Sequence, residues 1–188
     1  MSLNVLVVLE DSHLDKFIAI PIVERIFRDL GKPNARVSPL EYPRVMGHHQ
    51  AYEIISTDLQ DYRRSHSIWI FLQDADCARD IPYLREKVAK AGVRLASIAI
   101  HPEIEVWLLA GFASTQSFGL WEDIRKHHRL KEDVFEPFRR SQGIDEFVGG
   151  GRKELMRETL KNWNAVKTRC QEINELTQQL KEILEQIP

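Results

Sequence analysis

The stretch IFLQDADCARD, residues 70–80, is where an apolar run gives way to two aspartates, Asp74 and Asp76. The apolar part begins slightly earlier, at Ser67, and reads SIWIFL. A continuous run of β-branched and aromatic residues is typical of a strand buried on both faces, as strands of parallel sheets are. Residues 67–72 are therefore predicted to form such a strand, and the two aspartates are predicted to follow its carboxyl end.

Similar runs along the chain predict an α/β fold. Residues 3–9 (LNVLVVL) and 94–100 (RLASIAI) predict two more buried strands. Residues 35–41 predict a weaker strand, which Pro39 places at the edge of a sheet. Helical patterns occupy residues 14–30, 49–63, 80–91 and 103–112. This alternation predicts a mostly parallel sheet with helices on both faces.

The last third of the chain has a different texture. Residues 113–151 are mixed, and the glycines of GGGRK, residues 149–153, predict a hinge. From Arg152 one long polar helix is predicted almost to the end, with apolar residues at steps of three and four. This stripe either docks on the chain's own domain or forms an interface with a partner or a second copy, giving a homo-oligomer. We therefore divide the chain into an α/β core, residues 1–112, and a helical C-terminal extension, residues 113–188.

Composition limits the classes of function. The 188 residues carry a formal net charge of -2, so any contact with nucleic acid needs a local basic patch. The two cysteines form neither a disulfide framework nor a metal motif. No run approaches the roughly 18 apolar residues of a membrane span. The start, MSLNVLVVLED, lacks the basic segment of a signal peptide, so we expect a cytoplasmic protein without a membrane partner.

Acidic residues follow three of the predicted strands. Ligands of an open parallel sheet bind at the carboxyl ends of its strands, so these acids are expected at one edge. Crowded carboxylates raise each other's pKa values unless a cation neutralises them, and Mg2+ (or Mn2+) prefers such oxygen ligands. The alternative is that Asp76, Asp11 or Ser12 caps the helix that follows it. The acids are Glu10 and Asp11, then Asp74 and Asp76, then Glu103 and Glu105.

Two motifs give the chain a family resemblance. IFLQDADC, residues 70–77, and HPEIEVWLLAGF, residues 101–112, resemble the D-x-D and E-x-E-x-W-L-L-A elements of TOPRIM-like proteins. The resemblance covers residues 3–112. It extends to the TOPRIM domain of topoisomerases, primases and OLD-type nucleases. It is strongest for small bacterial OLD-nuclease-related proteins of uncharacterised function, found beside ABC-type ATPases and associated with phage defence.

The first motif departs from that family. LEDSHLD stands here in place of V-E-G-x-x-E, so Asp11 replaces the glycine, and Asp15 follows Glu10 by five residues instead of four. An aspartate at the glycine position puts catalysis in question more than it does the fold.

The resemblance implies a TOPRIM-like (Rossmann-like) fold and Mg2+- or Mn2+-dependent phosphoryl transfer. The expected activity is that of a nuclease acting on DNA or RNA in bacterial defence. By resemblance, Glu10 is the general acid/base or a metal ligand, Asp74 and Asp76 are metal ligands, and Glu105 supports them. Asp11 is a further candidate metal ligand. The alternatives are a non-catalytic partner or sensor subunit of a complex containing an ABC-type ATPase, or a phosphatase or nucleotide-processing enzyme that acts on a small substrate.

Basic residues supply candidate phosphate contacts. Arg44, His48 and His49 lie in EYPRVMGHHQ, residues 41–50, near the same predicted edge, with an ordinary loop as the alternative. A second basic region, residues 125–131 and 138–143, is expected to be solvated surface, with a nucleic-acid contact as the alternative. The tyrosines carry no supporting motif and are predicted to pack; they are Tyr42, Tyr52, Tyr62 and Tyr83.

Overall fold

The fold is built on a parallel sheet of four strands. The computed structural model describes residues 3–58, 65–74, 81–112, 119–144 and 146–187. The strands lie in the order β2-β1-β3-β4, and every pairing is parallel. They are β1 (Asn4–Val8), β2 (Arg36–Pro39), β3 (Ile68–Asp74) and β4 (Arg94–Ile100). The predicted α/β fold with a parallel sheet is confirmed, and β2 is an edge strand, as Pro39 indicated.

Helices connect the strands and follow the last of them. Before β4 these are α1 (Lys16–Asp29), α2 (His48–Glu53), the π-helix η1 (Ile54–Asp58) and α3 (Ile81–Ala89). After β4 they are α4 (Glu105–Leu109), α5 (Trp121–Arg125), the π-helix η5 (Lys131–Phe135), α6 (Glu136–Ser141), α7 (Arg152–Lys161), α8 (Trp163–Arg169) and α9 (Gln171–Glu185). No helix in the described part of the chain has both the length and the apolar content needed to cross a membrane.

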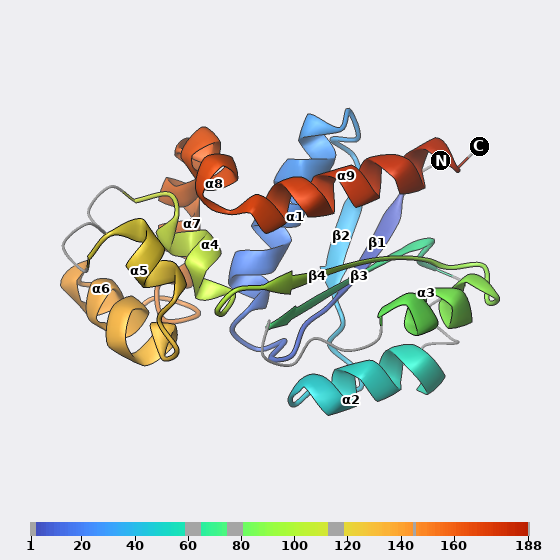
Figure 1. Cartoon of the computed structure of the whole chain (residues 1–188), viewed down its shortest axis with the longest axis horizontal. Coiled ribbons are helices and arrows are strands. Elements are labelled where there is room, and N and C mark those ends of the chain that lie inside the picture. Colours follow the sequence, from blue (N-terminus) through green and yellow to red (C-terminus); the bar gives the residue numbers. More distant parts are fainter. Residues whose placement is uncertain (1–2, 59–64, 75–80, 113–118, 145, 188) are drawn as a thin grey trace.

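The two faces of the sheet carry separate apolar cores, because side chains alternate along each strand. On one face, Leu6 and Phe71 belong to a cluster that includes residues of α2, η1 and α3. On the other face, Val7 and Ile70 belong to a larger cluster with α1, α4 and the C-terminal helices. Figure 1 shows α2 and α3 on one side of the sheet and α1 and α9 on the other. This is a Rossmann-like α/β fold with additional C-terminal helices.

The single long C-terminal helix that we predicted is wrong. The chain leaves helical geometry at Asn162 (φ −102°, ψ 35°) and again at Cys170 (φ −119°, ψ 89°), so three helices replace one. The predicted apolar stripe nevertheless faces inward. It joins the same core as β1 and β3, so the chain's own sheet covers it. Its buried members are Met156, Trp163, Val166, Cys170, Ile173, Leu176 and Leu180.

Helix α9 lies along β4, at the end of the sheet opposite β2 (Figure 1). The side chain of Gln179 bonds to both backbone groups of Ser97 there. The N–H of Ser97 donates to Oε1 of Gln179 (3.0 Å), and Nε2 of Gln179 donates to the carbonyl of Ser97 (3.0 Å). An amide side chain thus occupies the position where another strand would bond.

The carboxyl ends of β1, β3 and β4 meet at one edge of the sheet. Val8 is opposite Phe71, and Asp74 is opposite Ile100, so the strands end close to one another. Strand β3 runs two residues further than we predicted, through Gln73 and Asp74. Gln73 and Asp74 pair with Ala99 and Ile100 of β4, and the buried amide of Gln73 donates to the hydroxyl of Ser97 (3.3 Å).

Candidate functional site

Glu10, the residue two places after β1, lies at the edge of the sheet where β1 and β3 end. Its Oε1 accepts the backbone N–H of Asp74 (3.0 Å) and lies 3.3 Å from Nδ1 of His48. The Glu10 side chain is 15% exposed. Gly47, with φ 91°, turns the chain into α2, and its N–H donates to the carbonyl of Glu10 (2.9 Å). The carboxylate of Glu10 is therefore fixed between the end of β3 and the start of α2.

Asp74 has a strongly raised pKa. The pKa of Asp74 is raised from 3.8 to about 8, chiefly by burial and next by the nearby carboxylate of Glu10. More distant acids act in the same direction; they are Asp15, Glu105 and Glu103. The acids that follow three strands thus influence one another, as predicted, and we call Glu10, Asp15, Asp74, Glu103 and Glu105 the acidic edge.

Asp15 belongs to this edge, although our sequence analysis did not select it as a site residue. The pKa of Asp15 is raised to about 7, chiefly by burial and then by the nearby carboxylates of Glu105 and Asp11. Lys131 and Arg152 oppose it. Asp15 is the last acid of LEDSHLD, but it follows Glu10 by five residues instead of the four of the family motif, so it was not chosen as a site residue. The turn before α1 absorbs the extra residue, with the N–H of Asp15 donating to the carbonyl of Asp11 (3.2 Å).

Glu105 is held by cations of the protein itself. It is 2% exposed, and its Oε1 lies 3.2 Å from Arg152 and 3.9 Å from Nζ of Lys131. The guanidinium of Arg152 also lies 4.7 Å from the centre of the Phe135 ring. Because its charge is already compensated, Glu105 is better suited to support the other acids than to bind a metal directly.

Glu103 is less buried and has a different partner. It accepts the backbone N–H of Lys131 (2.9 Å). Burial raises the pKa of Glu103, this hydrogen bond opposes the rise, and Glu105 adds to it. Glu103 and Glu105 therefore both connect the end of β4 to η5.

The remaining predicted acids have separate outcomes. Asp11 holds the turn after β1, because its Oδ1 accepts the N–H of His13 (2.8 Å) and its backbone forms a bridge with Met46. Asp76 lies outside the described residues. The described residues contain no group of three or more His, Cys, Asp or Glu side chains already arranged to hold a metal ion.

The two histidines predicted to contact phosphate, His48 and His49, lie in different environments. His48 is buried, stacks on Phe71 (ring centres 6.0 Å apart) and faces Glu10, whereas His49 is exposed. Nε2 of His48 is buried and has no hydrogen-bond partner among the described residues. The structure therefore brings His48 to the acidic edge as a residue that positions Glu10.

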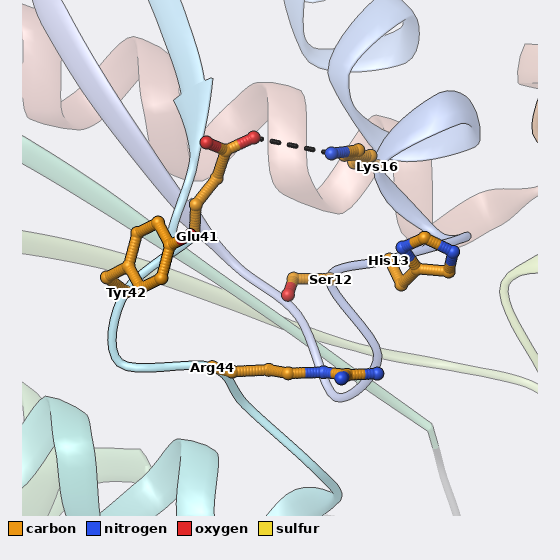
Figure 2. Close-up of a pocket in the computed structure, with 6 residues that line it drawn as sticks. All are labelled: Ser12, His13, Lys16, Glu41, Tyr42 and Arg44. Atoms are coloured by element: carbon orange, nitrogen blue, oxygen red, sulfur yellow. Dashed lines mark hydrogen bonds and ion pairs between the residues drawn. The ribbon is translucent and has the colours of Figure 1, made fainter.

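Arg44 lies in a separate polar pocket next to this edge (Figure 2). The pocket has a volume of about 270 Å³. Lys16, the first residue of α1, pairs across it with Glu41 (3.3 Å). Tyr42 is 76% exposed, so our prediction that it packs is wrong. The lining residues are Ser12, His13, Lys16, Glu41, Tyr42 and Arg44, and we call this the Arg44 pocket.

Comparison with known proteins yielded no matching family model, no matching curated protein and no matching solved structure. The TOPRIM resemblance therefore stays a prediction based on the sequence motifs.

Proposed function

We propose that this chain is a Mg2+- or Mn2+-dependent phosphoryl-transfer protein of TOPRIM type. We propose further that it is a nuclease that hydrolyses phosphodiester bonds of DNA or RNA in a bacterial defence context. The observation that supports this most directly is the raised pKa of Asp74, about 8, at an edge where acids from three strands gather. A divalent cation is the natural partner of such uncompensated carboxylate oxygens.

Carboxylate oxygens are the ligands that a hard cation prefers. Glu10, Asp15 and Asp74 supply carboxylate oxygens at one edge, and Asp76 is the further ligand that the motif predicts. When bound, the cation would neutralise charge on the scissile phosphate and lower the pKa of an attacking water. His48 would hold the carboxylate of Glu10 in place. Glu105, which is paired with Arg152, would support the other acids without binding the cation directly.

A metal-dependent melting experiment tests this proposal. Mg2+ or Mn2+ at millimolar concentration should raise the melting temperature, because a ligand that binds the folded chain stabilises it. Asp74→Ala should abolish the rise. Asp123→Ala, at an exposed aspartate of α5, should retain it. Absence of a shift with either metal would refute the metal site, and a cleavage assay on plasmid and single-stranded substrates then tests the activity.

A second candidate function has its own supporting observation. The charge of Glu105 is neutralised within the protein by Arg152, as expected if the acids stabilise the fold instead of binding a metal ion. The chain would then be a non-catalytic partner or sensor subunit in a complex with an ABC-type ATPase. This alternative predicts stable co-purification with an ATPase encoded beside it, and no cleavage by the isolated chain under conditions where metal binds.

A further inference from the structure

The Arg44 pocket is joined directly to the acidic edge. Its walls are the turn after β1 and the loop after β2, and two backbone contacts hold them together. The N–H of Gly47 donates to the carbonyl of Glu10 (2.9 Å), and Asp11 forms a β-bridge with Met46. A molecule seated in the pocket would therefore lie beside the acids that we propose bind metal.

The lining of the pocket suits an anion. Lys16 and Arg44 supply two cationic groups, and Glu41 supplies one carboxylate, so the fixed charges leave a positive excess. Ser12 and His13 contribute further polar groups (Figure 2). The volume of about 270 Å³ lies at the low end for small-molecule sites, so it suits one phosphate with its sugar.

An exposed aromatic ring lies at the rim of the same pocket. Tyr42 is 76% exposed and Met46, in the same loop, is 73% exposed. Tyr42 lines the pocket together with Arg44, and Met46 follows Arg44 by two residues in the same loop. A flat ring next to cationic groups is the arrangement by which proteins bind single strands, with the base stacked on the ring and the phosphate paired with the cations.

We infer that the Arg44 pocket binds one nucleotide of a single-stranded nucleic acid, with its phosphate against Arg44 and Lys16 and its base stacked on Tyr42. Bases within a duplex are already stacked on their neighbours, so a duplex cannot offer a base face to Tyr42 without being opened. This inference rests on the proposed function, because it names the substrate class of that site.

Binding without metal separates this inference from catalysis. Fluorescence anisotropy in EDTA would compare a labelled single-stranded oligonucleotide with the same sequence as a duplex. We expect the single strand to bind more tightly. Tyr42→Ala should weaken its binding at least about fivefold, whereas Tyr42→Phe, which keeps a ring for stacking, should stay within about twofold of the wild type.

Salt dependence tests the phosphate contact by a different readout. For single strands, each neutralised phosphate contributes about 0.7 to the slope of log K against log salt. Arg44→Ala should reduce that slope by about this amount, and Tyr42→Ala should leave it unchanged. The matched controls are Tyr83→Ala, at an exposed tyrosine of α3, and Arg157→Ala, at an exposed arginine of α7, and both should bind like the wild type.

Two results would overturn the inference: duplex binding as tight as single-strand binding, or equal effects of Tyr42→Ala and Tyr83→Ala. Failure of the proposed function gives a different pattern. Single strands would then bind in a Tyr42-dependent manner, but neither Mg2+ nor Mn2+ would produce cleavage.

Discussion

Replacing Asp74 with asparagine should stabilise the metal-free protein at alkaline pH. Asparagine keeps the shape of the side chain, and the bond between Glu10 and this residue uses the backbone N–H, which the substitution retains. It removes a carboxyl whose pKa is raised from 3.8 to about 8 by burial and by the neighbouring carboxylates. One pKa unit corresponds to about 1.4 kcal/mol, so the ionised group costs the fold at most about 6 kcal/mol. Since water reaches the half-buried side chain, we expect a gain of about 2 kcal/mol.

The dependence on pH has a defined sign. Between pH 3.8 and about 8 the folded chain keeps the Asp74 proton and the unfolded chain loses it. The folded state therefore binds more protons in this window, and its stability falls as the pH rises. Asp15 acts in the same direction between pH 3.8 and about 7. The advantage of Asp74→Asn should be greatest above pH 8 and should disappear near pH 4.

Thermal melting in EDTA at a series of pH values measures this effect. For a chain of this length, a gain of about 2 kcal/mol corresponds to a rise of roughly 4–8 °C. Asp123→Asn, at an exposed aspartate, is the matched control and should change the melting temperature little at any pH. A variant less stable than the wild type at pH 8.5, or a gain that does not vary with pH, would refute our account of Asp74.

Two further substitutions test neighbouring contacts. Arg152→Met leaves Glu105 buried without its closest cationic partner and should cost about 3 kcal/mol in urea unfolding, while adding Glu105→Gln should recover most of it. Equal stability of Arg152→Met and the wild type would contradict this. His48→Ala removes the imidazole next to Glu10 and should weaken Mn2+ binding in calorimetry about 10- to 100-fold. Unchanged affinity would mean that His48 does not orient the carboxylate.

The strands and their edge were predictable because their signals are local. Three stretches, LNVLVVL, SIWIFL and RLASIAI, have apolar side chains on both faces of the strand. This pattern is typical of strands that are covered on both faces by helices. Strand β4 spans the same residues as predicted, Arg94–Ile100. The breaks at Asn162 and Cys170 were not predictable from spacing, because the apolar steps continue across both and the packing against the sheet sets the bends.

The acids that meet at the site were predictable from the sequence, but the cationic partner of Glu105 was not. The order of acids after strands was enough to bring Glu10 and Asp74 together. The partner of Glu105 was not visible, because Arg152 lies far along the chain and no local pattern links the two. Tyr42 was assigned to packing because nothing in a sequence marks a tyrosine as exposed.

The contact between Gln179 and Ser97 also bears on how this protein behaves at high concentration. An uncovered outer strand offers its N–H and C=O groups to any other strand, and folded proteins can aggregate in that way. Here one amide side chain satisfies both groups of Ser97, and α9 covers the strand around it. The C-terminal helix therefore prevents β4 from pairing with strands of other molecules. A truncation that removed α9 would be expected to yield insoluble chains even if the rest still folded.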